Sequence, residues 1–283
     1  MIQRIKNLLV TGSANKPMAT DIFFEAAGPP KPVVIYAHGF NGFKDWGNFD
    51  LIAERFAEAG FVFVKFNFSH NGTTPEAPET FTDLEAFGNN NYTIQLQDLG
   101  HIIDWISAPA NPYRLFMDTN QISLLGHSMG GGICIIKTAE DNRIKKLVTW
   151  AAISECKTPW GNWSEAKMTD WKRSGVAWYV NGRTKQDMPL YYQLHEDFVE
   201  HEERLDIRNA IASIRVPILV CHGSQDPAVP VKAAHQLVEW QPAARIFTVE
   251  SDHVFGRSHP WPHTYLPIPT ETATLETISF FLA

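Results

Sequence analysis

The chain has 283 residues, of which 44% are hydrophobic and 19% charged, as in an ordinary soluble globular protein. Its net charge is −7 at pH 7, and its basic residues form only short groups such as Arg143–Lys146. Nucleic acid is therefore not expected as a partner, because phosphate binding needs concentrated Lys and Arg. No apolar run approaches the roughly 18 residues that a membrane-spanning helix requires.

The cysteines and the N-terminus favour a cytoplasmic protein. The first residues, MIQRIKNLLVTG, include basic side chains but too short an apolar stretch for a secretory signal. Cys134, Cys156 and Cys221 are few, odd in number and widely spaced, and each lies in or beside an apolar segment. We expect them to be buried, reduced thiols. Nothing in the sequence indicates an oligomeric state.

Apolar segments along the chain predict eight strands. The inner ones are apolar on both faces and rich in Val, Ile and Phe, as strands are when helices cover both sides of a parallel sheet. The predicted strands are Ile5–Val10, Thr20–Glu25, Val33–Ala37, Phe61–Phe68, Gln121–Leu125, Lys146–Ala151, Ile218–Cys221 and Arg245–Glu250.

Helical patterns lie between these strands. Apolar residues recur at spacings of three and four in 49–59 and in 99–106. Further helices are predicted over 129–138, 231–240 and 271–281. Strand followed by helix, repeated, predicts an α/β fold with right-handed crossovers, in which a mostly parallel eight-stranded sheet carries helices on both faces.

The segment 154–213 interrupts this alternation. It contains no clear strand, and its second half looks helical and charged. The strand pattern resumes at Val216. We therefore expect a helical lid inserted into a core formed by residues 1–153 and 214–283, rather than a separate domain.

Residues 124–132 read LLGHSMGGG and place Ser128 between a predicted strand and a predicted helix. So tight a turn strains the backbone of its apex residue, and Gly126 and Gly130 lack the Cβ that would clash there. This is the G-x-S-x-G pattern that exposes a serine nucleophile, although a chance Gly-Ser turn would read the same. Neither the Lys-Ser of a phosphate loop nor the G-x-G of a dinucleotide fingerprint is present.

A serine nucleophile needs a base, and the base needs an acid to orient it. Asp226 follows one predicted strand and His253 follows the next. The carboxyl ends of parallel strands share one edge of a sheet, so we expect these side chains to meet Ser128. The order serine, acid, histidine predicts a catalytic triad.

Two other acids compete with Asp226. Asp252 is too near His253 in sequence to reach the far side of the imidazole easily. Glu155, after the strand around Val148, is an alternative position for the acid.

The remaining histidines have simpler interpretations. His38, His127 and His222 are expected to pack and form hydrogen bonds beneath the site. His195 and His201 lie six residues apart, whereas a helix needs a spacing of four to direct two histidines at one metal. We therefore expect no metal.

The motifs GHSMGG, HGSQDPAVP and SDH resemble the nucleophile, acid and histidine positions of the α/β-hydrolase superfamily, and the resemblance covers almost the whole chain. Residues 37–42, AHGFNG, resemble its oxyanion loop. This implies that the backbone N–H groups of Phe40 and Met129 hold the oxyanion. The chain also resembles the cinnamoyl-esterase and dienelactone-hydrolase-like branch, with Ser128 where the latter usually has cysteine.

These observations predict a serine hydrolase that cleaves a small-molecule carboxylic ester without a cofactor. Ser128 attacks the acyl carbon, His253 transfers the proton to the leaving alcohol, and Asp226 orients the imidazole. Thioesters, peptides with a free end and carbon–carbon bonds are alternative substrates for the same groups. A non-catalytic relative that binds a small ligand is an alternative of another class.

The insertion holds four of the nine tryptophans. We expect it to cover the carboxyl edge of the sheet above Ser128, because it enters and leaves between strands on that side. Some of these rings are expected to anchor the insertion, and one or two to line an apolar acyl pocket. The four are Trp160, Trp163, Trp171 and Trp178.

Overall fold

The computed structural model describes all of residues 1–283 and contains a central sheet with the strand order β1-β2-β4-β3-β5-β6-β9-β10. Strand β2 is antiparallel to its neighbours β1 and β4, and every other adjacent pair is parallel. This confirms the predicted mostly parallel sheet of eight strands. The strands are β1 Ile2–Thr11, β2 Pro17–Glu25, β3 Lys31–Ala37, β4 Val62–Phe66, β5 Met117–His127, β6 Ile144–Trp150, β9 Ile218–Gly223 and β10 Arg245–Val249.

The sheet separates two hydrophobic cores. Successive side chains of a strand point to opposite faces, so Val33 and Ile35 of β3 belong to one core, while Val34 and Tyr36 belong to the other. This explains why the inner strands have apolar residues on both faces.

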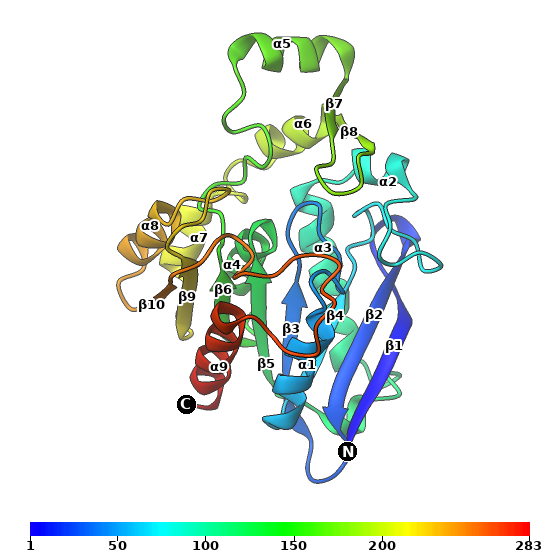
Figure 1. Cartoon of the computed structure of the whole chain (residues 1–283), viewed down its shortest axis with the longest axis vertical. Helices are drawn as coiled ribbons and strands as arrows, with labels where there is room; N and C mark the ends of the chain where they lie inside the picture. Colours follow the sequence, from blue (N-terminus) through cyan, green and yellow to red (C-terminus); the bar gives the residue numbers. More distant parts are fainter.

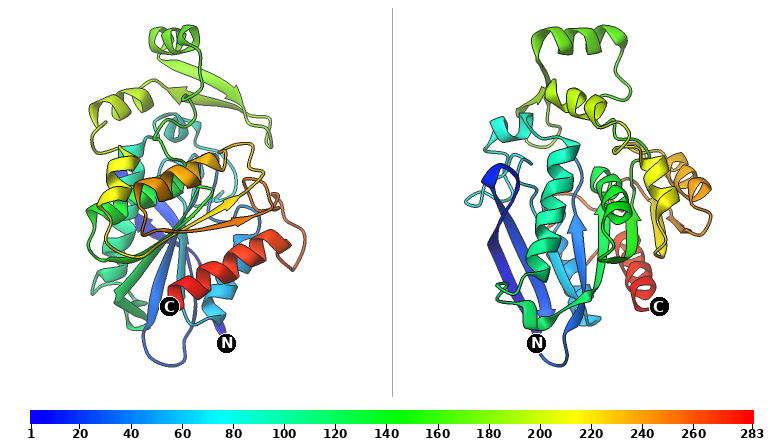
Figure 2. Two further views of the ribbon diagram at one scale, coloured as in Figure 1. Left: turned by 90° about the vertical axis from the view of Figure 1, so that its left-hand side faces the viewer. Right: turned by 180° about the vertical axis from the view of Figure 1, so that it is seen from behind.

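Helices cover both faces of the sheet (Figures 1 and 2). Helices α1 Phe49–Glu58 and α9 Ile268–Leu282 pack on the face of Val34. Helices α3 Tyr92–Ser107, α4 Met129–Glu140 and α8 Lys232–Trp240 pack on the other face. Their apolar stripes recur at helical spacing, as the sequence predicts.

The segment 154–213 is called the cap below, and its residues 165–200 lie at the top of the molecule in Figure 1. It contains three helices, α5 Glu165–Ser174, α6 Gln193–Glu200 and α7 Ile207–Ser213. It also contains an antiparallel hairpin, β7 Val176–Val180 with β8 Asp187–Tyr191, so the expectation of a segment without strands was wrong. The hairpin strands are short and β8 contains Pro189, a residue that weakens a strand pattern.

Two glycines of the body lie directly against the cap. Helix α7 packs against α4, where a Cβ on Gly132 would come within 3.0 Å of Ile207. The long polar segment after β4 contains a short helix, α2 Leu84–Gly88. A Cβ on Gly88 would come within 2.8 Å of the ring of Tyr191 in β8. At both places the cap packs closely on the body.

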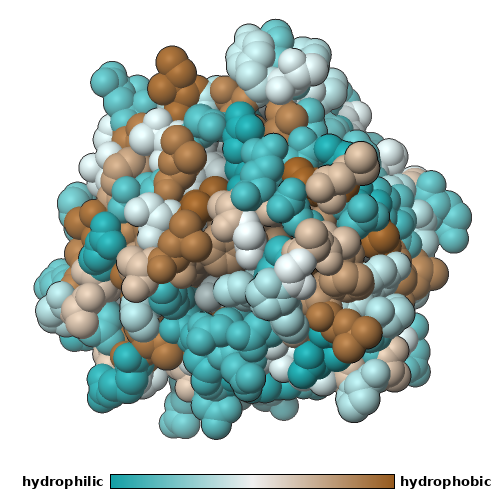
Figure 3. Space-filling model, turned by 90° about the horizontal axis from the view of Figure 1, so that it is seen from below, coloured by the Kyte–Doolittle hydropathy of each residue, from teal (hydrophilic) through white to brown (hydrophobic).

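No helix of the chain combines the length and the apolar composition that crossing a membrane would require. Figure 3 shows the face opposite the cap, where apolar and polar residues are interspersed.

Candidate active site

Ser128 occupies the sharp turn between β5 and α4. Its backbone has φ 56° and ψ −121°, a conformation that is strained for a residue with a side chain. A Cβ on Gly130 would lie 2.4 Å from the carbonyl oxygens of Ala37 and His38. Glycine at this position is what allows α4 to approach the end of β3 so closely.

His253 and Asp226 meet at the same edge of the sheet. Nδ1 of His253 lies 2.7 Å from Oδ2 of Asp226. The other carboxylate oxygen, Oδ1, accepts hydrogen bonds from the backbone N–H groups of Ala228 and Val229 at 2.8 and 2.9 Å. These bonds fix the carboxylate, so that Oδ2 points at the imidazole.

His222 supplies a further contact to this carboxylate. Its Nε2 donates to the carbonyl oxygen of Val229 at 2.8 Å and lies 3.3 Å from Oδ2 of Asp226. Burial alone would raise the pKa of Asp226, but the hydrogen bonds from His222 and His253 outweigh it and lower the pKa below its ordinary value. The carboxylate is therefore ionised at neutral pH.

The two competing acids lie elsewhere. The carboxylate of Glu155 pairs with Lys157 at 3.1 Å. Asp252 Oδ1 accepts from the backbone N–H groups of Val254 and Gly256 at 3.2 and 2.8 Å, and so closes the turn that contains His253. Of the three carboxylates, only Asp226 is hydrogen-bonded to His253.

The loop after β3 passes directly beside Ser128. A Cβ on Gly39 would lie 2.9 Å from Cβ of Ser128. The N–H groups of Phe40 and Met129 donate no hydrogen bond within the protein, and Met129 begins α4, where the first amides lack helical acceptors. Both amides are thus free to bind a ligand oxygen.

His38 supports this loop from beneath. Its Nδ1 donates to the carbonyl oxygen of Gly39 at 2.9 Å, and its Nε2 accepts from the backbone N–H of Phe68 at 3.3 Å. Burial lowers the pKa of His38 to about 4, so the ring is neutral at pH 7. Its contacts are those of a structural histidine.

Ser128 and His253 line one cavity of about 180 Å³. Its apolar wall comes from Phe40, Phe43 and Trp46. No hydrogen bond joins Ser128 and His253 here, although hydrogen bonds of this kind are often long before substrate binds.

Comparison with known proteins identifies the family. The BD-FAE family model matches residues 20–241. The chain belongs to the BD-FAE family. The matched region includes Ser128 and Asp226, and it ends before His253.

Two known proteins are similar to parts of this BD-FAE member. The quorum-quenching protein AidA of Acinetobacter baumannii is 29% identical over 126 residues, which are 44% of this chain but only 35% of AidA. A Mycoplasma pneumoniae protein named esterase/lipase 2 is 25% identical over 254 residues, 82% of this chain and 84% of that protein.

The fold is also that of Est1E from Butyrivibrio proteoclasticus, whose structure was solved with ferulic acid bound. The two structures superimpose with a TM-score of 0.68 at 17% sequence identity, over 97% of this chain and 98% of Est1E. Family and fold place the chain among the esterases and related hydrolases of the α/β-hydrolase fold.

None of the four predicted tryptophans lines the cavity that contains Ser128. Trp160 and Trp171 are buried, with ring centroids 6.0 Å apart, and the ring of Trp160 also lies 6.1 Å from that of Tyr92 in α3. Nε1 of Trp171 donates to the carbonyl oxygen of Leu190 in β8 at 2.7 Å. Trp163 packs edge-on against Trp171, and Trp178 is 57% exposed on the outside of β7.

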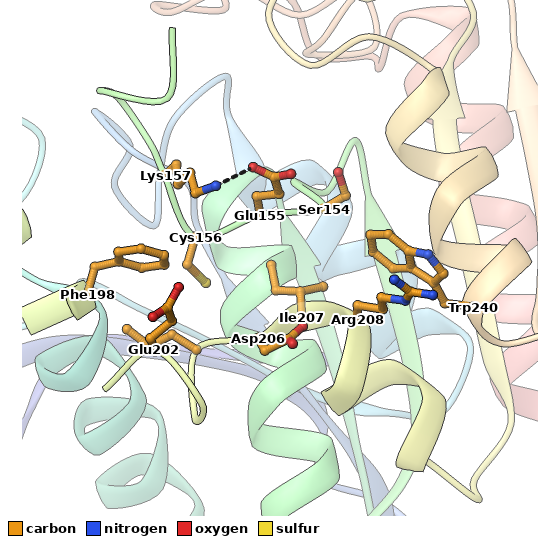
Figure 4. Close-up of a pocket in the computed structure, with 11 residues that line it drawn as sticks. Ser154, Glu155, Cys156, Lys157, Phe198, Glu202, Asp206, Ile207, Arg208 and Trp240 are labelled. Carbon is orange, nitrogen blue, oxygen red and sulfur yellow. Dashed lines mark ion pairs between the residues drawn. The ribbon is translucent and has the colours of Figure 1, made fainter. Parts of the chain in front are cut away.

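A second cavity of this BD-FAE member, of about 290 Å³, is lined by residues of the cap and by Trp240 of α8 (Figure 4). Neither Ser128 nor His253 lines it. Three of its charged groups contact one another or a ring: Lys157 pairs with Glu155, and the guanidinium of Arg208 lies over Trp240 at 5.9 Å. Cys156 lines it as well, but burial raises the pKa of this thiol, which disfavours a thiolate nucleophile.

Three carboxylates beneath the loop after β3, those of Asp21, Asp45 and Asp50, lie within 4.8 Å of one another. The ammonium groups of three lysines form ion pairs with these carboxylates. Lys44 and Lys6 contact Asp21 at 2.8 and 2.7 Å, and Lys65 contacts Asp45. This cluster is therefore an ion-pair network that fixes the far end of the loop.

Proposed function

We propose that the chain is a serine esterase that hydrolyses carboxylic esters through an acyl-enzyme. The observation that carries this proposal is the 2.7 Å contact between His253 Nδ1 and Asp226 Oδ2, beside a cavity that Ser128 also lines. Because the carboxylate holds the proton on Nδ1, Nε2 of His253 is left free to accept the proton of a serine hydroxyl.

The proposed reaction has two halves, acylation of Ser128 and hydrolysis of the acyl-enzyme, and the same groups act in both. Oγ of Ser128 attacks the acyl carbon while His253 takes its proton, and Asp226 stabilises the imidazolium that forms. The N–H groups of Phe40 and Met129 donate to the oxyanion. His253 then protonates the leaving alcohol. Water, activated by the same imidazole, releases the acid and restores Ser128.

The cavity favours compact acyl groups. Its volume of about 180 Å³ is below the roughly 300 Å³ at which pockets for drug-sized ligands begin. The apolar wall of Phe40, Phe43 and Trp46 suits a short aliphatic chain or a flat ring. Long acyl chains would have to leave the cavity and contact the cap.

A panel of esters tests the proposal. We expect hydrolysis of 4-nitrophenyl acetate and butyrate with kcat/KM at least about tenfold above that of the octanoate, a difference of about 1.4 kcal/mol. Methyl ferulate tests the flat aromatic group. A protein that only binds ligands would hydrolyse none of these esters faster than the Ser128→Ala variant does.

A further inference from the structure

Phe40 and Asn41 lie at the tip of the loop that passes Ser128, and no backbone hydrogen bond holds either residue. The residues on both sides are anchored to the body. Gly39 O accepts from His38 Nδ1 at 2.9 Å and from Gly42 N at 3.0 Å, and Lys44 N donates to Asn67 Oδ1 at 2.7 Å. The tip is thus the one part of the loop without such an anchor.

The cap supplies the only hydrogen bond of this tip. The hydroxyl of Tyr179, in β7, donates to Oδ1 of Asn41. Burial raises the pKa of Tyr179, so the phenol keeps its proton and acts as the donor. Asn41 has φ 57°, a left-handed conformation that asparagine tolerates better than most residues. A bond to its side chain therefore constrains a backbone that is already unusual.

The ring of Phe40 is held by the same tyrosine. Its centroid lies 5.9 Å from that of Tyr179 and 5.7 Å from that of Phe87 in α2. The side chain of Phe40 therefore sits between the cap hairpin and α2, with Tyr179 on one side. Two independent contacts connect this tyrosine to the residues around the Phe40 amide.

We propose that Tyr179 is a positioning residue for the oxyanion hole. Through Asn41 and the ring of Phe40, the cap hairpin holds the Phe40 N–H where the oxyanion of the acyl-transfer step forms. This inference rests on the proposed esterase function. A tyrosine that only anchored the cap would affect stability or KM, and it would leave kcat unchanged.

The Tyr179→Phe variant removes the hydroxyl and keeps the ring. We expect kcat to fall about tenfold with KM within about twofold, because a misplaced donor costs less than the 10²–10³ of a deleted one. The loss should be equal for 4-nitrophenyl acetate and butyrate. The inhibition constant of 1,1,1-trifluoroheptan-2-one, whose adduct with serine carries an oxyanion, should rise by the same factor.

Tyr191→Phe is the matched control. Tyr191 lies on the other strand of the same hairpin, and its hydroxyl donates to Oε2 of Glu85 at 2.6 Å, away from the loop. We expect its kcat to stay within about twofold of the wild type. Thermal melting of both variants shows whether the cap remains folded.

A double-mutant cycle with Asn41→Gly decides whether the two side chains act together. Glycine accepts the positive φ of this position and lacks the acceptor. If Tyr179 acts through Asn41, the double variant is no slower than the slower single variant. Two results would overturn the inference: losses in kcat of the two single variants that multiply in the double variant, or a Tyr179→Phe enzyme with the kcat of the wild type. In either case, ester hydrolysis by the wild-type enzyme would still support the esterase function. Loss of turnover in the wild type itself would instead refute the esterase function.

Discussion

His127 donates a hydrogen bond from Nε2 to the carbonyl oxygen of His253, 2.9 Å away, and the two rings lie 4.8 Å apart. Burial, followed by the nearby His253 and Arg257, lowers the pKa of His127 well below its ordinary value. The ring is therefore neutral, with its proton on the nitrogen that faces the carbonyl. The residue before the proposed nucleophile thus holds the backbone of the proposed base.

Replacing His127 by Phe keeps a ring and removes the donor. We expect kcat for 4-nitrophenyl butyrate to fall about tenfold, because small displacements of a catalytic group are costly. His127→Gln, whose amide can donate from a similar position, should recover part of the loss. Two variants with wild-type kcat would show that this hydrogen bond does not position His253.

The assignment of the acid is tested by exchanging carboxylates for amides. Asp226→Asn should lower kcat by about 10⁴-fold, because the amide favours the wrong imidazole tautomer. Glu155→Gln is the control and should change kcat less than twofold, since Glu155 pairs with Lys157 away from the site. If Glu155→Gln lost as much activity as Asp226→Asn, the acid would be wrongly assigned.

Gly130→Ala tests the close approach of α4 to β3. The new Cβ would lie 2.4 Å from two backbone carbonyl oxygens, so either the turn or the fold must shift. We expect a loss of more than about 3 kcal/mol in the free energy of unfolding, measured in urea. Gly182→Ala, where a Cβ meets nothing within 4 Å, should change it by less than about 0.5 kcal/mol.

His38 should make the fold sensitive to acid. Its pKa is about 4 in the folded protein because it is buried, against about 6.5 in an unfolded chain. Between these values the unfolded chain binds a proton that the folded protein does not. The free energy of unfolding therefore falls as the pH falls from 6.5 to 4, with His38 contributing about 3 kcal/mol of the loss.

His38→Asn removes this titration while keeping a donor near Gly39. Its unfolding free energy, measured in urea from pH 7 to 4.5, should depend less steeply on pH than that of the wild type. The exposed His235 provides a control, and His235→Asn should leave the wild-type slope unchanged. Equal slopes for His38→Asn and the wild type would contradict the role given to burial.

The sequence predicts the sheet and the place of the proposed triad for one physical reason. Ser128, Asp226 and His253 each follow a strand of a parallel sheet, and parallel strands end at one edge. Local patterns therefore place these side chains together without any knowledge of the loops between them.

The contacts between the cap and the body cannot be predicted from strand ends in this way. The bond between Tyr179 and Asn41 joins a short hairpin strand to a loop 138 residues away in sequence, and no periodic pattern encodes that pairing. The positions of the clustered tryptophans of the cap also could not be predicted from the sequence. Their composition suggests a pocket, but Trp160 and Trp171 are buried against each other, with ring centroids 6.0 Å apart.

The central claim is that Ser128 forms the covalent intermediate. It is tested most directly by treating the wild type with diisopropyl fluorophosphate, mapping the modified peptide by mass spectrometry and following 4-nitrophenyl butyrate hydrolysis in the same samples. We expect one adduct, on Ser128, with activity lost in proportion to labelling. The Ser128→Ala variant should remain unlabelled, with kcat lower by three or more orders of magnitude, about 4 kcal/mol. A wild type that hydrolyses the ester without forming this adduct, or a Ser128→Ala variant with undiminished activity, would contradict it.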